Sequence, residues 1–190
     1  MELPVLFIGP MFAGKSTAGE MLAKRLSVPF YELDALRWDY YAEIGYDGAH
    51  ADKLRKEQGF EAMYQYWKPF EIHAVERAVI EHGDGVISFG AGHSVYEDTA
   101  LLERAERALA PIANVILLLP SADMAEASAT LKERFMEVGR QEGFTPTEQS
   151  LGIIDHFLQH PSNARLAKQI IYTKGMTPDQ TCEEILKILK

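Results

Sequence analysis

A glycine-rich phosphate-binding pattern constrains the fold of this chain more than any other feature. Residues 9–17 read Gly-Pro-Met-Phe-Ala-Gly-Lys-Ser-Thr, which completes the pattern G-x-x-x-x-G-K-[ST]. In such a loop the backbone N–H groups surround phosphate oxygens, the lysine reaches the β and γ phosphates, and the next hydroxyl binds Mg²⁺. The pattern predicts ATP with Mg²⁺ as the ligand, contacted by Gly9, Met11, Phe12, Ala13, Gly14, Lys15, Ser16 and Thr17.

The segments on either side of this loop fit a strand and a helix. The residues before it, Val5–Ile8, form an unbroken apolar run that is typical of a buried parallel strand. After it, residues 15–26 place alanine, methionine and leucine at helical spacing. A strand, a glycine loop and a helix N-terminus together form an anion site, so an accidental glycine turn is the weaker interpretation.

Apolar runs and helical patterns alternate along the whole chain. Strands are predicted at Val5–Ile8, Pro29–Tyr31, Val86–Phe89, Val115–Leu119 and Ile170–Thr173. Helices are predicted at Lys15–Leu26, Ala35–Ile44, Phe60–His82, Glu97–Ala108, Ala122–Val138, Leu151–Gln159 and Pro178–Leu189. This alternation predicts an α/β fold in one domain over residues 1–190, with a parallel sheet and helices on both faces.

Two segments differ from the ordinary connections of such a fold. Residues 35–82 form a long insertion rich in aromatic side chains, most of which we expect in the core and a few in a substrate pocket. Residues 138–161 are polar and punctuated by glycine, which is typical of a lid over an active site. An ordinary surface connection is the alternative interpretation of this second segment.

Composition narrows the classes of partner. The formal net charge of −9 disfavours DNA and RNA, because an acidic surface repels a phosphate backbone. The single cysteine, Cys182, cannot form an internal disulfide and fits a reducing compartment. No apolar run approaches the length of a membrane span or of a signal peptide. We therefore expect a cytoplasmic monomer or homodimer that acts on a small molecule.

Two carboxylates follow the second predicted strand. Glu32 and Asp34 occupy alternate positions there, so we expect both at the carboxyl edge of the sheet, where ligands bind in open α/β folds. Phosphoryl transfer needs oxygen ligands for Mg²⁺ and a carboxylate near the proton of the acceptor hydroxyl. The alternative for Asp34 is an N-cap of the helix that begins at Ala35.

Cations and small residues supply the remaining candidates. Arg134 and Arg140 fall near and inside the predicted lid, where an arginine can neutralise charge in the transition state. The third strand ends in Gly90-Ala91-Gly92, whose small residues allow a ligand to approach the backbone. His93 follows them and is either a base or a loop histidine with no catalytic role.

These motifs together resemble those of the shikimate kinase-like group of P-loop small-molecule kinases. The family's phosphate loop matches Gly9–Thr17, and its D-x-D motif is similar to Glu32-Leu33-Asp34. Its F-R-x-x-E motif is similar in spacing to residues 67–71, and its triple glycine to residues 90–92. A late strand, an adenine loop and a terminal helix are similar to residues 170–189.

The resemblance implies a sheet order of 2-3-1-4-5 and a transfer of the γ-phosphoryl group of MgATP to a hydroxyl. It implies a metal role for Glu32 beside Ser16, and an acceptor role for Asp34. It also places Lys68 and the Gly90, Ala91 and Gly92 backbone at the acceptor, and Lys174 at the adenine. Lys15, Asp34, Arg134 and Arg140 are then the candidate catalytic residues.

Three departures leave the identity of the acceptor open. Glu32 replaces the family's first aspartate, Lys68 replaces its arginine, and residues 159–165 hold no clean counterpart of its late substrate arginine. Ser162 and Asn163 in that segment would suit a neutral hydroxylated acceptor. A nucleoside or nucleotide kinase is the alternative enzyme, and a regulatory ATP-binding protein is the alternative from another class.

Overall fold

A parallel sheet of five strands forms the centre of the protein, in a computed structural model that describes residues 2–190. The strands are β1 (Val5–Ile8), β2 (Phe30–Glu32), β3 (Val86–Ser88), β4 (Asn114–Leu119) and β5 (Gln169–Tyr172). Their order is β2-β3-β1-β4-β5, which confirms the predicted topology. The central strand β1 pairs with β3 and β4 and is completely buried, as its unbroken apolar run requires.

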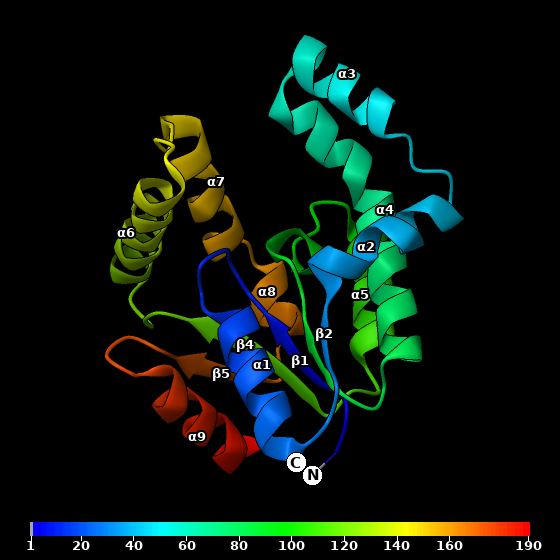
Figure 1. Ribbon diagram of the computed structural model, residues 1–190. Coiled ribbons are helices and arrows are strands. Elements are labelled where there is room, and N and C mark those ends of the chain that lie inside the picture. The colour runs from blue at the N-terminus through cyan, green and yellow to red at the C-terminus, as the bar shows by residue number, and fades with distance from the viewer. Residues whose placement is uncertain (1) are drawn as a thin grey trace.

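Helices cover both faces of this sheet (Figure 1). On one face α1 (Lys15–Leu26) packs against α9 (Pro178–Ile188). On the other face α5 (Thr99–Leu109) packs between α4 (Phe60–Glu81) and α8 (Ser162–Leu166). This confirms the predicted α/β class, and Cys182 on α9 is a buried core residue as expected. No helix within residues 2–190 is both long and apolar enough to cross a bilayer.

Two helical hairpins project beyond the edge of the sheet from which the phosphate loop leaves β1 (Figure 1). One consists of α3 (Gly48–Gln58) and α4, and it follows α2 (Leu33–Glu43). The other consists of α6 (Met124–Glu142) and α7 (Glu148–Gln159). The hairpins stand on opposite sides of the loop, so the residues 35–82 and 138–161 singled out from the sequence both reach the same edge.

The helices between β2 and α4 differ from the predicted ones. Helix α2 begins at Leu33, so Asp34 lies in the first turn of a helix and neither continues an extended segment nor caps α2. Helix α3 was not predicted at all. Its N-cap is Asp47, whose carboxylate accepts hydrogen bonds from the backbone N–H groups of Ala49 and His50.

Helix α6 continues further than the glycines around residue 140 suggested. Gly139 lies inside the helix. Glycine is required at this position for close packing, because a Cβ there would overlap the Phe144 carbonyl oxygen and the Pro146 ring. The helix ends at Gly143, whose φ of 80° is the left-handed conformation that favours glycine at a helix C-terminus. The irregular part of the predicted lid is therefore only the short connection between α6 and α7.

Candidate functional site

Two glycines determine the shape of the phosphate loop between β1 and α1. Gly9 has a φ of 128°, and a Cβ on it would overlap the Leu118 carbonyl oxygen of the neighbouring strand. Gly14 has a φ of 92° and immediately precedes the first turn of α1. Only glycine adopts both conformations without strain. The loop thus directs the N-terminal N–H groups of α1 toward the position that an anion would occupy.

Lys15 lies inside this loop. Its side chain is buried, and its Nζ donates a hydrogen bond of 2.8 Å to the Pro10 carbonyl oxygen. Burial lowers the pKa of Lys15 to about 8, and the charges of Asp34 and Glu32 act in the opposite direction. A triphosphate bound in the loop would supply Lys15 with a stronger, charged partner.

The hydroxyl of Ser16 and the carboxylate of Glu32 meet beside the loop. Ser16 Oγ donates a hydrogen bond to Glu32 Oε1, although the two residues belong to α1 and to the end of β2. Within residues 2–190 no three His, Cys, Asp or Glu side chains gather as a complete metal site. A hydroxyl and one carboxylate nevertheless fit Mg²⁺, which keeps several waters and takes phosphate oxygens as its other ligands.

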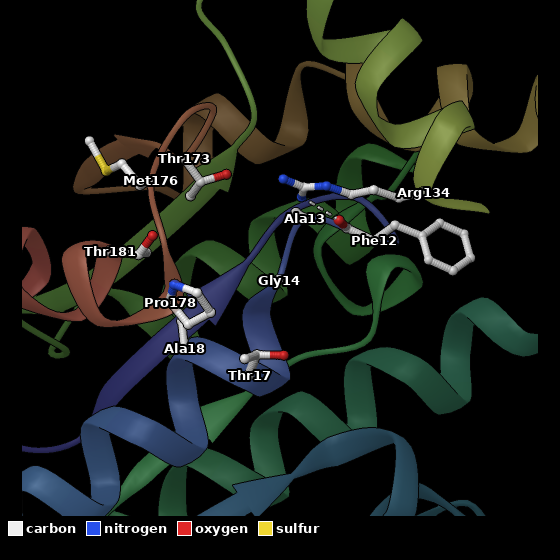
Figure 2. Close-up of a pocket in the computed structure, with 10 residues that line it drawn as sticks. All are labelled: Phe12, Ala13, Gly14, Thr17, Ala18, Arg134, Thr173, Met176, Pro178 and Thr181. Carbon is white, nitrogen blue, oxygen red and sulfur yellow. Dashed lines mark hydrogen bonds between the residues drawn. The ribbon is translucent and has the colours of Figure 1, made fainter. Parts of the chain in front are cut away.

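A pocket of about 400 Å³ opens next to the loop (Figure 2). Its walls come from the loop, from α1, from α6 and from the segment after β5, and they consist of Phe12, Ala13, Gly14, Thr17, Ala18, Arg134, Thr173, Met176, Pro178 and Thr181. The buried Thr173 Oγ1 has no hydrogen-bond partner in the described part of the chain. An unsatisfied hydroxyl in a pocket beside a phosphate loop is what a polar ligand such as a nucleotide would satisfy.

From this side of the pocket, sequence reasoning selected only Lys174. The walls formed by Thr173, Met176, Pro178 and Thr181 follow β5 and include the start of α9, in the segment that the family resemblance compares with an adenine loop and a terminal helix. Lys174, the residue predicted there, is half exposed and pairs with Glu126. Its contact with a nucleotide therefore stays a prediction.

The two lid arginines have different surroundings. Arg134 on α6 donates a 2.8 Å hydrogen bond from Nη1 to the Phe12 carbonyl oxygen of the phosphate loop (Figure 2). Phe135 stacks on the Phe12 ring with the centroids 4.8 Å apart. Arg140 instead pairs with Glu137 on the surface of α6, and its side chain is 65% exposed. Only Arg134 is thus in contact with the loop in this structure.

Asp34 lies at the same edge of the sheet, on the side of β3. Its Oδ1 accepts a hydrogen bond of 2.9 Å from Arg37 Nη1 and lies 3.9 Å from His93 Nδ1. Burial lowers the pKa of His93 to about 4, so its ring is uncharged near neutral pH. The histidine predicted as a possible base is therefore a poor base, and Arg37 is a neighbour of Asp34 that the sequence analysis did not select.

The small residues after β3 form a short 3₁₀ helix, η1 (Ala91–Ser94), that packs closely on acidic side chains. A Cβ on Gly90 would overlap the Asp34 carboxylate, and a Cβ on Gly92 would overlap the Glu71 carboxylate. The glycines therefore permit the close approach that their pattern predicted, although in this structure the groups that approach are side chains of the protein.

Lys68, the predicted acceptor ligand, uses its ammonium group inside the protein. Its Nζ donates to the carbonyl oxygens of Gly92 at 3.0 Å and Val95 at 2.9 Å, and it pairs with the Glu71 carboxylate. Both side chains are buried, at 3% and 4% exposure. The rings of Tyr64 and Tyr96 lie on the remaining sides. Lys68 as placed holds the segment after β3 against α4.

Ser162 and Asn163 on α8 are engaged in the same way. Ser162 Oγ donates to the Tyr96 carbonyl oxygen and accepts from the Tyr96 N–H. Asn163 accepts from Ser94 Oγ and donates to the Phe157 carbonyl oxygen. Both residues are buried. Through these contacts, Ser162 and Asn163 hold α8 against the segment after β3.

Comparisons with known proteins agree with this geometry. A family model described as shikimate kinase matches residues 11–190. The shikimate kinase of Saccharopolyspora erythraea is 30% identical over 180 residues, which cover 95% of this chain and 90% of that enzyme. The shikimate kinase of Streptomyces avermitilis is 27% identical over 192 residues, which cover 100% of this chain and 98% of that enzyme.

Solved structures share the fold at lower sequence identity. A shikimate kinase from Acinetobacter baumannii in complex with shikimate matches with a TM-score of 0.62 at 16% identity, over 97% of this chain and 90% of that one. A gluconokinase from Sinorhizobium meliloti matches with a TM-score of 0.57 at 15% identity, over 96% of this chain and 89% of that one. At these sequence identities, the two matches show a shared fold.

Proposed function

The chain belongs to the shikimate kinase family and is an ATP-dependent small-molecule kinase, and we propose that it transfers the γ-phosphoryl group of MgATP to a hydroxyl beside Asp34. The contact between Ser16 and Glu32 carries this proposal. It brings the loop hydroxyl and a strand-end carboxylate together at the edge where Asp34 also lies. A kinase needs these three groups on one side of the transferred phosphate.

Each group has one task in the transfer. The loop amides and Lys15 hold the β and γ phosphates, while Ser16 and Glu32, the latter through water, hold Mg²⁺. The metal neutralises charge on the phosphate oxygens when it is bound. Arg134, already at the loop, offers a further cation to the γ phosphate. Thr173 and the other walls of the pocket receive the rest of the nucleotide.

The acceptor is a small, hydroxylated, shikimate-like metabolite. Its reacting hydroxyl gives its proton to the Asp34 carboxylate while its oxygen forms a bond to the γ phosphorus. The bond between that phosphorus and the bridging oxygen breaks, and ADP leaves with the electron pair. Asp34 is suited to this task because half of its side chain is exposed at the edge of the sheet.

The test is ADP release from MgATP in the presence of a panel of hydroxylated metabolites that includes shikimate. We expect one compound to stimulate release by the wild type, and Asp34→Asn to reduce the stimulated turnover by about 10²–10⁴-fold with MgATP affinity nearly unchanged. Asp39→Asn, an exposed position on the same helix, is the matched control. Turnover of Asp34→Asn equal to that of the control would remove Asp34 from the mechanism.

A further inference from the structure

Unsatisfied polar groups are concentrated around Asp34. Among residues 2–190, the buried side-chain atoms without a hydrogen-bond partner include Arg37 Nε, Tyr41 OH and both ring nitrogens of His93. Leaving such groups unpaired is unfavourable, because each has lost its contact with water and gained no partner in the protein. Their clustering beside one half-exposed carboxylate points to a ligand that would pair them.

The geometry of α2 explains why three of these residues share one place. Positions 34, 37 and 41 are spaced by three and four residues, which places them on one face of the helix. That face is directed to η1, because Asp34 packs on Gly90 and lies 3.9 Å from His93. Asp34, Arg37, Tyr41 and His93 thus form one group, which we name the Arg37 cluster.

Arg37 is held rigidly in this cluster. Its guanidinium carbon lies 4.5 Å from the centre of the Trp38 ring and 5.7 Å from that of Trp67. Stacking on aromatic rings orients a guanidinium while leaving the donors on its edge available. The Arg37 side chain keeps 23% of its surface exposed, so a ligand can reach it.

Lys68 cannot perform the same task without disrupting the fold. To bind a ligand anion, the Lys68 ammonium group would have to leave two carbonyl oxygens and the buried Glu71 carboxylate. Removing the cation would leave a buried carboxylate without a compensating charge, which strongly destabilises a folded protein. Within residues 2–190, Asp34 is the only hydrogen-bond or ion-pair partner of Arg37, and its carboxylate is the one that the reaction itself requires.

We infer that Arg37 is the specificity-determining cation of the acceptor site, and that a carboxylate on the acceptor takes Arg37 from Asp34 and so frees Asp34 for the reacting hydroxyl. This inference rests on the proposed function. A planar carboxylate matches the guanidinium edge in a bidentate pair. His93 and Tyr41, both uncharged, then have hydroxyl groups of the acceptor as partners. A neutral acceptor leaves the Arg37–Asp34 pair intact and reacts slowly.

The test compares matched acids and neutral analogues: shikimate with its methyl ester, and gluconate with glucitol. For wild type we expect the KM of the acid to be roughly 10- to 100-fold below that of its analogue. Arg37→Gln removes this preference and, since Asp34 is no longer paired, raises kcat for the neutral analogue. Arg37→Lys restores part of the preference. Arg55→Gln, an exposed arginine on α3, is the control for lost charge.

A merely structural role for Arg37 would slow acid and neutral analogue equally, and that result would overturn the inference. Equal KM values for both forms in the wild type would overturn it as well. If no compound stimulates ADP release, the proposed function fails, and calorimetry with the same pairs in the presence of MgADP decides the inference alone. Tighter binding of the acid by wild type but not by Arg37→Gln supports it, while equal binding or no binding of any acid overturns it.

Discussion

The polar residues that the family resemblance compares with known motifs are used in opposite ways on the nucleotide side and on the acceptor side of this edge. On the nucleotide side, Lys15, Ser16 and Thr173 face the loop or its pocket, and their internal contacts are few. On the acceptor side, outside the Arg37 cluster, Lys68, Glu71 and Asn163 bind to one another, to Ser94 or to backbone carbonyl groups in the interior. The first set awaits a ligand, whereas the second set holds the fold together.

A motif made of backbone groups keeps its function in a distant relative more readily than a motif made of side chains. The phosphate loop acts mainly through backbone N–H groups and glycine conformation. Pairing between side chains elsewhere in the protein does not occupy these backbone groups. An acceptor motif acts through side chains. Substitution of one neighbouring residue is enough to let such a side chain form its hydrogen bonds within the protein instead of with a ligand. Lys68 has the spacing of a ligand residue and the contacts of a structural one.

Replacement of Lys68 should have the largest effect on stability. Lys68→Met leaves the Glu71 charge buried without its partner, so we expect the free energy of unfolding to fall by about 3–5 kcal/mol. Urea unfolding measures this change. Lys53→Met, an exposed lysine on α3, is the control and should stay near the wild type.

The double variant Lys68→Met/Glu71→Met separates pairing from packing. It removes both charges at similar volume, so most of the lost stability should return. A stable Lys68→Met protein with a raised KM for the acceptor would contradict the comparison, because it would assign Lys68 to ligand binding.

A smaller effect is expected at Asn163. Asn163→Ala leaves Ser94 Oγ and the Phe157 carbonyl without a partner, which should lower the free energy of unfolding by roughly 1–3 kcal/mol. The KM of the acceptor should not change. Gln159→Ala, an exposed amide at the end of α7, provides the reference for a surface substitution. A normal unfolding midpoint together with weaker acceptor binding would place Asn163 in the site.

On the nucleotide side, a modest effect of pH on MgATP affinity is expected. Lys15 has a pKa of about 8 in the ligand-free protein, and bound phosphate favours its charged form. Affinity for MgATP should therefore be constant below pH 7.5 and fall by up to about tenfold per pH unit above pH 8. Calorimetry in buffers of different ionisation enthalpy should detect proton uptake near pH 8. Lys15→Arg, which stays charged, should abolish this pH dependence, and a dependence that survives in it would have another origin.

The sequence predicted the features that depend on unbroken patterns. The five strands and their order followed from apolar runs and from the family resemblance, and the loop followed from its complete motif. Helix α3 was missed because it is almost wholly polar, with Ala51 as its one buried residue, so it has no apolar stripe. Gly139 was interpreted as a break, although close packing against the next loop is what requires it.

The candidate site was predictable only in part for a physical reason. Glu32 and Asp34 could be placed because they follow a strand, and strand ends define the edge. The partner that a side chain chooses depends on tertiary packing, which no local pattern encodes. Arg37 carried a usable signal, since it lies one helical turn after Asp34, but that signal needed the true start of α2.

The pairing of β1 also affects how the protein is made. Val5 of β1 lies beside Val86 of β3 and Asn114 of β4, so both of its neighbours follow it by more than 80 positions. A ribosome that adds about 5–20 residues per second supplies β3 only about 4–16 s after β1. During that interval an apolar strand has no sheet to join, and the phosphate loop that follows it has no framework. Before β3 and β4 have been made, bound nucleotide therefore cannot stabilise this part of the chain.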